Sequence, residues 1–203
     1  ENNALDFDDL LTLPIKLFNE KPEILEYYRK KYKYILVDEY QDTNKPQFRF
    51  INLLSDKHRD IFVVGDDDQS IYGWRGADIR NILNFSKEYP DSKIIKLEQN
   101  YRSTSNILDV AHSVISRNNR RADKKLWTEN AKGSKVQLIE CYDDRHEANQ
   151  VLDSIQKSNF SNSEIVILYR TNAQSRIIED ILRKNAVPYQ IIGGVKFYER
   201  KEI

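Results

Sequence analysis

The sequence has no methionine and a single cysteine, Cys141, among its 203 residues. One cysteine cannot form an internal disulfide, and free thiols persist in reducing compartments, so we expect a cytoplasmic protein with a buried, inert thiol. The three histidines are scattered, with no acid or serine at a catalytic spacing. The sequence therefore excludes a disulfide-stabilised fold and gives no sign of a metal-ligand cluster.

Long apolar runs are missing as well. No stretch approaches the roughly 20 apolar residues of a membrane-spanning helix, and no signal-peptide pattern opens the chain, so we expect no membrane partner. The 32 Lys and Arg side chains balance the 32 Asp and Glu side chains. This neutral total excludes a wholly basic surface but leaves room for a local nucleic-acid groove. Because the chain starts at Glu1 and lacks methionine, we expect it to be an internal piece of a longer protein.

Hydrophobic periodicity predicts an α/β fold. Short apolar runs of strand length alternate with segments in which apolar residues recur every three or four positions. This alternation is typical of parallel sheets covered by helices. The predicted strands are residues 34–37, 61–64, 93–97, 135–141, 164–169 and 188–192, and the predicted helices centre on residues 48–54, 79–85, 107–115, 151–155 and 177–182.

Other local signals refine this picture. The first thirty-odd residues show helical spacing with a Lys-Pro break at 21–22, which predicts a helical connector. Asp78, Ser103 and Asn172 have side chains that favour helix N-caps. The basic run at 120–125 is interpreted as a solvated face.

Two adjacent acids, Asp38 and Glu39, follow the first predicted strand. In open α/β sheets, ligands bind at the carboxyl ends of the strands. One carboxylate at that position can hold Mg²⁺ while the other orients an attacking water, as in the Walker-B half of a nucleotide-hydrolysing site. The alternative is a solvated acidic turn.

A second polar loop follows the next predicted strand. Gly65 allows a sharp exit, and three acids then lead to Gln69, an amide suited to a terminal phosphate or its attacking water. Tyr72 and Trp74, with Arg75 beside them, are suited to stacking on unpaired bases. Burial of both rings in the core is the alternative, and the neighbouring glycines favour a loop instead. We therefore expect one element to touch phosphate at one end and bases at the other.

Two further strand ends carry arginines. Tyr101 is suited to stacking on a purine, and Arg102 to placing a fixed positive charge on a γ-phosphate as an arginine finger; the alternative for Arg102 is a surface salt bridge. Arg170, Thr171 and Asn172 end a later strand, where they can contact a nucleic-acid phosphate. A plain N-cap explains Asn172 equally well. The paired glycines that open the segment 193–200 predict a hinge.

Taken in order, these segments resemble the UvrD/PcrA/Rep group of superfamily-one DNA helicases over essentially the whole chain. The group usually has phenylalanine at the position of Tyr40. The three acids before Gln69 favour this group over nuclease-helicases of the RecB/AddA type. The segments that carry the resemblance are 38–44 as motif II, 65–77 as motif III and 99–103 as motif IV, together with 6–11 and 192–203.

The resemblance implies parts of two RecA-like motor domains from an ATP-dependent 3′–5′ DNA helicase or translocase of repair or replication. It implies ATP and Mg²⁺ as cofactors, and single-stranded DNA and single/double-strand junctions as partners. The implied roles are Mg²⁺ binding by Asp38, water activation by Glu39, γ-phosphate sensing by Gln69, an arginine finger at Arg102, adenine stacking by Tyr101, and contact with single-stranded DNA by Tyr72 and Trp74, with Arg75 bridging the two sites.

The resemblance also divides the chain. Residues 1–32 correspond to a connector that ends an accessory insertion, 33–95 to the second half of the first motor domain, and 96–203 to the first half of the second, up to a further accessory domain. The phosphate-cradling P-loop pattern is absent from the sequence, so we expect the chain alone to bind ATP poorly and not to unwind DNA. A RecB/AddA-like helicase–nuclease component and a non-catalytic DNA-binding module with a relict motor are the alternatives.

Overall fold

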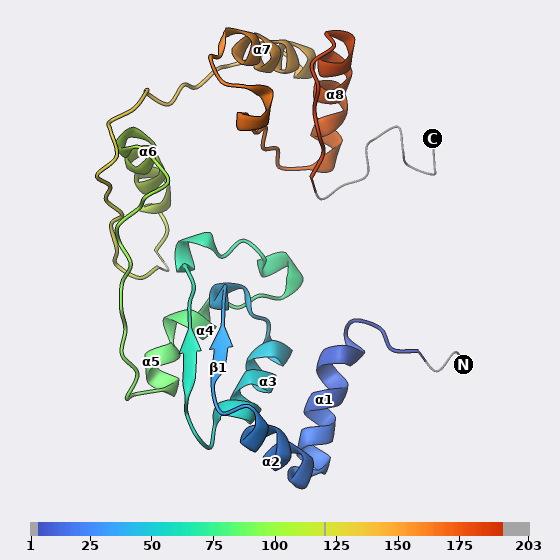
Figure 1. Ribbon diagram of the computed structural model, residues 1–203, viewed down its shortest axis with the longest axis vertical. Helices are drawn as coiled ribbons and strands as arrows, with labels where there is room; N and C mark the ends of the chain where they lie inside the picture. The colour runs from blue at the N-terminus through green and yellow to red at the C-terminus, as the bar shows by residue number, and fades with distance from the viewer. Residues whose placement is uncertain (1–3, 120, 193–203) are drawn as a thin grey trace. The chain divides into compact units, whose positions relative to one another are not determined.

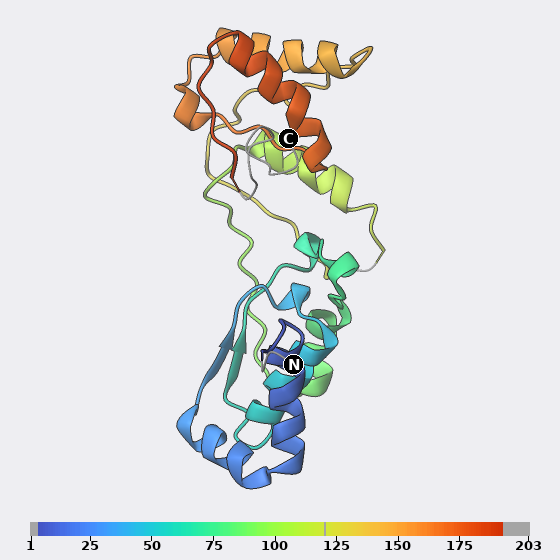
Figure 2. The same ribbon diagram turned by 90° about the vertical axis from the view of Figure 1, so that its right-hand side faces the viewer.

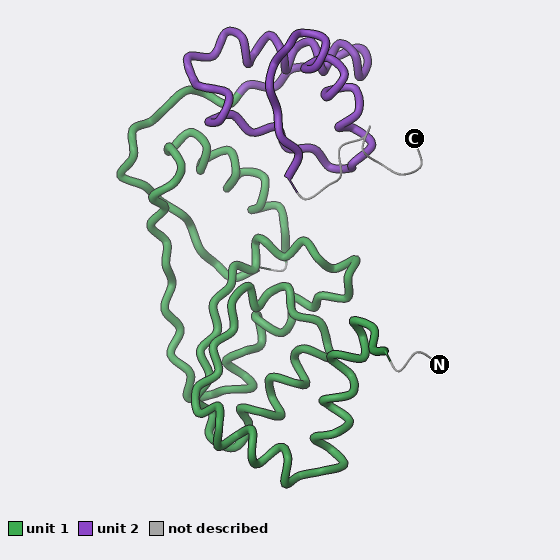
Figure 3. Tube along the Cα trace, turned by 45° about the vertical axis from the view of Figure 1, so that its right-hand side comes forward, with its two compact units in different colours: residues 1–136 green, residues 137–203 purple. Residues whose placement is uncertain are grey.

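The computed structural model describes residues 4–119 and 121–192. The chain divides into two compact units, Glu1–Val136 and Gln137–Ile203 (Figure 3). Within the described ranges, every helix is too short or too polar to cross a lipid bilayer. The predicted hinge segment at 193–200 lies outside the described residues.

Two short parallel strands form the centre of the first unit (Figure 1). β1 (Ile35–Val37) pairs with β2 (Ile61–Val63), with Leu36 opposite Phe62. Leu36 and Phe62 are largely exposed, whereas the residues on either side of them are half-buried. This period of two is expected for a strand pair with one face toward a core, and the parallel pair with its helices confirms the predicted α/β class.

Helices pack against the half-buried face of this pair. Phe18, Leu25 and Leu54 form the buried core, and Ile35 of β1 packs against it. α3 contacts both α1 and β1, and Figures 1 and 2 show α1 and α3 side by side. The bounds are α1 (Asp9–Glu20), α2 (Pro22–Lys31) and α3 (Lys45–Ser55).

Local chemistry explains where these helices begin and end. The predicted break lies between α1 and α2, and α2 begins at Pro22, whose missing N–H is harmless in a first helical turn. α3 begins with a capping box, in which the side chain of Asn44 accepts the N–H of Gln47 and the side chain of Gln47 accepts the N–H of Asn44. The helical spacing predicted for both regions is confirmed.

Short turns and helices complete the first unit. The helix predicted at 79–85 is divided into two four-residue helices around Asn84, whose backbone is not helical. The helix predicted at 107–115 is confirmed as α6. The remaining bounds are η1 (Tyr40–Asp42), η2 (Asp67–Gln69), η3 (Gly73–Arg75), α4 (Arg80–Leu83), α5 (Phe85–Glu88) and α6 (Ser105–Ile115).

The second unit is built on two predicted helices that pack against each other. Leu152 and Leu182 are buried between its elements. The buried carboxylate of Glu179 accepts hydrogen bonds from Ser175 Oγ at 3.0 Å and from Tyr189 Oη at 3.3 Å. The bounds are α7 (Asp144–Lys157), η4 (Asn162–Glu164), η5 (Asn172–Gln174) and α8 (Ser175–Lys184).

Four strand predictions are wrong for the described residues. No β-strand is assigned in the segments 93–97, 135–141, 164–169 and 188–192. Glu164, the first residue of the third segment, is the last residue of η4. Alternating exposure persists in part, since Ile165 and Ile167 are half-buried while Val166 and Leu168 are exposed. The apolar pattern is therefore present, but a strand also needs a hydrogen-bonded neighbour, and none pairs with these segments in the described ranges.

The predicted N-caps are shifted. Thr104, not Ser103, occupies the N-cap of α6, because the side chain of Asn100 accepts the N–H of Ser103 at 2.7 Å and makes a turn first. Thr171, not Asn172, caps η5. Asp78 lies one residue before the N-cap of α4, although its carboxylate does accept the N–H of Arg80.

The buried hydroxyl of Tyr40 yields a stability prediction. Tyr40 is fully buried, and its Oη has no hydrogen-bond partner among the described residues. Burial raises the pKa of Tyr40 to about 12, with smaller contributions from Tyr89 and Glu88. Tyr40→Phe is expected to increase the free energy of unfolding by about 1 kcal/mol at pH 7, because an unsatisfied buried hydroxyl is removed.

The pH dependence and a matched control sharpen this test. Unfolded tyrosine ionises near pH 10 and folded Tyr40 only near pH 12, so the parent protein loses stability as pH rises between these values. The difference in free energy of unfolding between Tyr40→Phe and the parent, measured by denaturant titration, should therefore widen between about pH 10 and about pH 12. Tyr89→Phe should have the opposite sign, because Tyr89 Oη bonds to Ser55 at 2.9 Å and to Asn52 at 3.1 Å. A less stable Tyr40→Phe protein would contradict the prediction.

Candidate functional site

The carboxyl ends of β1 and β2 lie at the same edge of the strand pair. Hydrogen bonds continue past the assigned strands, since Val64 N donates to Val37 O at 2.8 Å and Tyr40 N donates to Val64 O at 2.9 Å. These bonds place the loop that starts at Asp38 beside the loop that starts at Gly65. Two of the predicted motifs are thus neighbours.

The first loop presents two exposed acids, Asp38 and Glu39. Glu39 has a left-handed backbone, with φ 50° and ψ 43°. This conformation is uncommon for residues other than glycine and costs about 1–2 kcal/mol. Strained residues of this kind cluster at functional sites. The backbone turns at Glu39, shortly after the end of β1, and Asp38 Oδ1 accepts the Glu39 N–H at 2.9 Å.

Gln41 connects the two loops. Its side chain is 1% exposed, and its Nε2 donates to Glu39 Oε2 at 2.7 Å. Its Oε1 accepts the N–H of Asp66 at 3.0 Å, and its carbonyl accepts Ser70 Oγ at 3.2 Å. A buried amide with both ends engaged orients the Glu39 carboxylate. This role of Gln41 could not be predicted from the sequence, whose one signal is that Gln41 follows Glu39 by two positions.

Gly65 is required for this close approach. A Cβ atom at Gly65 would lie 2.5 Å from Gln41 Oε1, 2.9 Å from Ile82 Cδ1 and 3.1 Å from Tyr40 N. The last of these is a backbone atom that cannot move aside cheaply. The glycine predicted to give a sharp exit from the strand thus makes room for the amide of Gln41.

The second loop orients Gln69 through Asp66. The Asp66 carboxylate accepts the Asp68 N–H at 3.0 Å through Oδ1 and Gln69 Nε2 at 2.7 Å through Oδ2. Gln69 itself is exposed. Glu39 and Gln69 are therefore joined by a continuous path of hydrogen bonds that runs through Gln41 and Asp66.

Two basic residues from the segment after α6 neutralise the acids of this loop. Arg121 makes two hydrogen bonds of 2.9 Å to the carboxylate of Asp68. Lys124 Nζ contacts Asp66, lies 2.7 Å from Asp67 Oδ1 and lies 3.5 Å from Asp68 Oδ2. The Arg121 and Lys124 side chains are 14% and 16% exposed. The interpretation of the run 120–125 as a solvated face is therefore wrong for these two residues, because their partners are over 50 residues away in the sequence.

The electrostatics agree with this geometry. The hydrogen bond from Arg121 lowers the pKa of Asp68 below its ordinary value. Burial alone would lower the pKa of Lys124, but its bonds to Asp66 and Asp67 outweigh burial and raise it. Both shifts favour the charged forms of Asp68 and Lys124 across the neutral range.

The aromatic pair lies on the surface. Trp74 is 72% exposed and Tyr72 is 38% exposed. Their ring centroids are 6.3 Å apart, and the Arg75 guanidinium lies 4.5 Å from the Trp74 ring and 5.2 Å from the Tyr72 ring. The alternative of core rings is therefore wrong. Three side chains form an exposed aromatic and cationic platform a few residues after Gln69.

Tyr101 and Arg102 belong to a separate loop of the first unit. Both side chains are exposed, and Tyr101 Oη donates to Gln99 Oε1 at 2.8 Å. The side chain of Asn100 accepts the N–H of Arg102 at 3.0 Å. Asn130 donates to the Tyr101 carbonyl at 3.1 Å. Local bonds thus define the backbone of this loop and leave the Tyr101 and Arg102 side chains at the surface.

Arg170, Thr171 and Asn172 lie in the second unit. The Gln174 side chain accepts the N–H groups of Arg170 and Thr171, at 3.0 and 2.9 Å. The Asn172 carbonyl accepts Ser175 Oγ at 2.9 Å. All three residues are exposed, so their side chains are open to a ligand, while their backbone polar groups serve the turn.

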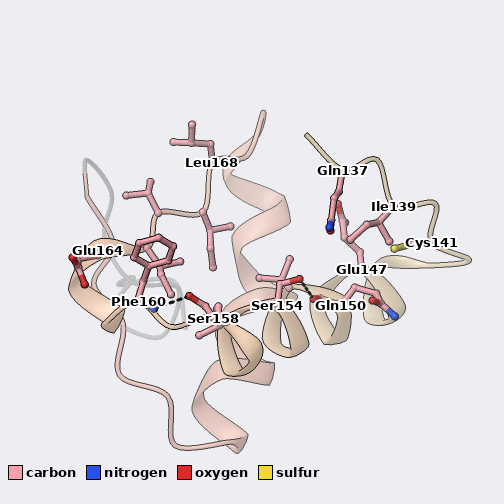
Figure 4. Close-up of a pocket in the computed structure, with 15 residues that line it drawn as sticks. Gln137, Ile139, Cys141, Glu147, Gln150, Ser154, Ser158, Phe160, Glu164 and Leu168 are labelled. Carbon is pink, nitrogen blue, oxygen red and sulfur yellow. Dashed lines mark hydrogen bonds between the residues drawn. The ribbon is translucent and has the colours of Figure 1, made fainter. Parts of the chain in front are cut away.

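An open groove of about 620 Å³ occurs in the second unit (Figure 4). It lies between α7 and the segments 137–141 and 164–168, and none of the predicted site residues lines it. Cys141 is one of its walls and is half-buried, so the expectation of a buried thiol is wrong.

Donor clusters for a protein-only metal site are not found in the described ranges, where no group of three or more His, Cys, Asp and Glu side chains is arranged to hold an ion. A site that shares Mg²⁺ with substrate phosphates needs fewer ligands, often one or two carboxylates. Asp38, exposed at the end of β1, has the oxygen chemistry for such a site.

Comparisons with known proteins agree with the motifs. Residues 1–90 match the UvrD/REP helicase N-terminal domain, and residues 95–203 match the UvrD-like helicase C-terminal domain. The chain is 56% identical to the ATP-dependent DNA helicase PcrA of Staphylococcus epidermidis and 53% identical to that of Staphylococcus aureus. Both matches cover 100% of this chain and 28% of the relative. The resemblance inferred from the motifs is confirmed, and the chain belongs to the UvrD-like helicase family.

Proposed function

We propose that the complete protein, of which this chain is an internal part, is an ATP-dependent DNA helicase that moves 3′ to 5′ along a single strand. The observation that carries the proposal is the path from Glu39 through Gln41 and Asp66 to Gln69, with the Tyr72–Trp74 platform following in the same loop. A hydrolytic carboxylate and a base-stacking surface on neighbouring loops are the parts that a motor needs.

The catalytic roles follow from position and chemistry. Glu39 accepts a proton from the water that attacks the γ-phosphate, and Gln41 holds its carboxylate in place. Gln69 bonds to the γ-phosphate or the attacking water and so senses whether ATP is present. Arg102 stabilises the charge that develops on the transferred phosphate, and Tyr101 stacks on the adenine. Support for the last two roles is their surface exposure.

Asp38 would hold Mg²⁺ through its exposed carboxylate. When bound, the ion neutralises phosphate charge. The P-loop that cradles the phosphates in nucleotide hydrolases is absent from the sequence, so ATP binding depends on parts of the protein outside these 203 residues.

Single-stranded DNA, at tails and at single/double-strand junctions, is the proposed partner. Tyr72 and Trp74 stack on successive bases, while Arg170, Thr171 and Asn172 contact backbone phosphates. Arg75 lies over both rings, where its charge also attracts the strand.

The proposed division of the chain follows the motifs. Residues 1–32 end an accessory insertion, 33–95 form the second half of the first motor domain, and 96–203 form the first half of the second. ATP closes the two motor domains on each other, and hydrolysis opens them, which shifts the platform along the strand.

Unwinding polarity tests the proposal. With ATP and Mg²⁺, the complete protein should separate a duplex that has a 3′ single-stranded tail and act weakly on one that has a 5′ tail. The isolated 203-residue chain should show near-background ATP turnover with single-stranded DNA. A preference for 5′ tails would overturn the direction, and robust hydrolysis by the isolated chain would overturn the dependence on a P-loop elsewhere.

A further inference from the structure

We propose that Lys124 and Arg121 are positioning residues of the motor. They hold the Asp66–Asp68 loop in the geometry in which Asp66 orients Gln69 and, through Gln41, Glu39. This inference rests on the proposed function, because the groups being positioned are those assigned to ATP hydrolysis. It concerns two residues that none of the motifs includes.

The contacts form one continuous path. Lys124 and Gln69 bind the two oxygens of the same Asp66 carboxylate. The backbone N–H of Asp66 donates to Gln41, whose amide donates to Glu39. A displacement of Asp66 is therefore transmitted to Gln69 directly and to Glu39 through one intervening side chain.

Charge explains why the loop needs these two cations. Asp66, Asp67 and Asp68 are consecutive, and the Asp67 side chain is 7% exposed. Three adjacent carboxylates that are partly withdrawn from water repel one another unless cations lie among them. Lys124 touches all three, and Arg121 holds Asp68 with a two-bond fork. The N–H of Ala122 also donates to Asp67 Oδ2 at 2.7 Å.

The path also crosses between the two matched regions. The acids lie within residues 1–90 and the cations within residues 95–203, which match different helicase domains. The same loop continues from Gln69 to the Tyr72–Trp74 platform. Lys124 and Arg121 are therefore placed to make the geometry of the hydrolytic groups depend on contact between the two matched regions, with DNA bound on the same loop.

Lys124→Gln in the complete protein tests the proposal, because it removes the charge but keeps a hydrogen-bonding side chain. Misplacement of a catalytic group by about 1 Å can lower a rate about 100-fold. We expect kcat for ATP hydrolysis with saturating single-stranded DNA to fall on the order of 10- to 100-fold, while KM for ATP changes less than about threefold. Stimulation by DNA, measured as the ratio of kcat with and without it, should fall too.

Three variants decide what the loss means. Lys124→Arg keeps the charge and should restore most of kcat. Lys125→Gln makes the same change at the exposed neighbouring lysine and should leave kcat unchanged. Arg121→Lys keeps the charge but loses the pair of hydrogen bonds to Asp68. If Lys124→Gln does not fold, kcat of Arg121→Lys is measured in the same assay instead. Parental kcat in Lys124→Gln, or in Arg121→Lys in that case, would overturn the proposal.

The outcome is separable from failure of the proposed function. If Glu39→Gln abolishes hydrolysis while Lys124→Gln and Arg121→Lys leave it intact, the function stands and the positioning role is wrong. If Glu39→Gln leaves hydrolysis intact, the assignment of the hydrolytic site itself fails. A loss in Lys124→Gln that only follows the folded fraction, measured by thermal melting, also contradicts a positioning role.

Discussion

Replacing Glu39 by glutamine in the complete protein is expected to lower kcat for ATP hydrolysis by about 10²- to 10⁴-fold, the usual contribution of a positioned general base. The amide has nearly the shape of the carboxylate, and its oxygen can still accept the bond that Gln41 Nε2 now donates to Glu39 Oε2 at 2.7 Å. The loop geometry is therefore preserved while the proposed proton acceptor is lost. The decrease in kcat is measured by steady-state ATPase assays with saturating single-stranded DNA.

Binding should survive this substitution. In the proposed mechanism Glu39 acts on the attacking water and not on the bound nucleotide, so KM for ATP and affinity for single-stranded DNA should change little. Glu23→Gln is the matched control, since it makes the same chemical change at an exposed position in the first turn of α2. A decrease of kcat of less than about threefold in Glu39→Gln would rule out general-base catalysis by this residue.

The parts of the fold that could be predicted from the sequence are those determined by residues close to one another in the sequence. α7 and α8 follow from apolar residues repeated on one helical face. β1 and β2 follow from short apolar runs bounded by polar residues, and these two runs find each other as partners. The four runs that failed have the same local pattern. Pairing is a long-range property, and no local pattern reveals whether a neighbouring strand is present.

The candidate site divides in the same way. The exposed positions of Asp38, Glu39 and Gln69 after β1 and β2 could be predicted, because a polar run that follows an apolar run is visible in the local sequence. The orientation of Glu39 by Gln41 could not, since it depends on a buried amide reaching a second loop. The pairing of Lys124 with Asp66 joins residues 58 positions apart in the sequence. It could not be predicted, because a basic run whose acidic partner is distant in the sequence has the pattern of a solvated surface.

Trp74→Ala is expected to weaken binding of single-stranded DNA on the order of 10- to 100-fold, because stacking of a base on an aromatic ring contributes about 1–3 kcal/mol. Trp74 is 72% exposed, so its removal leaves no cavity in the core and the folded fraction should not change. Trp74→Phe should retain most of the affinity. Tyr34→Ala, at a ring that is 73% exposed on the amino-terminal side of β1, should have no effect.

The salt dependence of binding separates stacking from charge. Stacking releases no counterions, so Trp74→Ala should lower affinity equally at all salt concentrations and leave the slope of log K against log salt unchanged. Arg75→Gln removes the guanidinium that lies 4.5 Å from the same ring and should reduce that slope by about one. Fluorescence anisotropy with an oligonucleotide, titrated at several salt concentrations, measures both effects. If Trp74→Ala changes the slope but not the affinity at low salt, the ring holds Arg75 in place and does not stack on bases, and the proposed mechanical link between the hydrolytic loop and the strand has to run through charge alone.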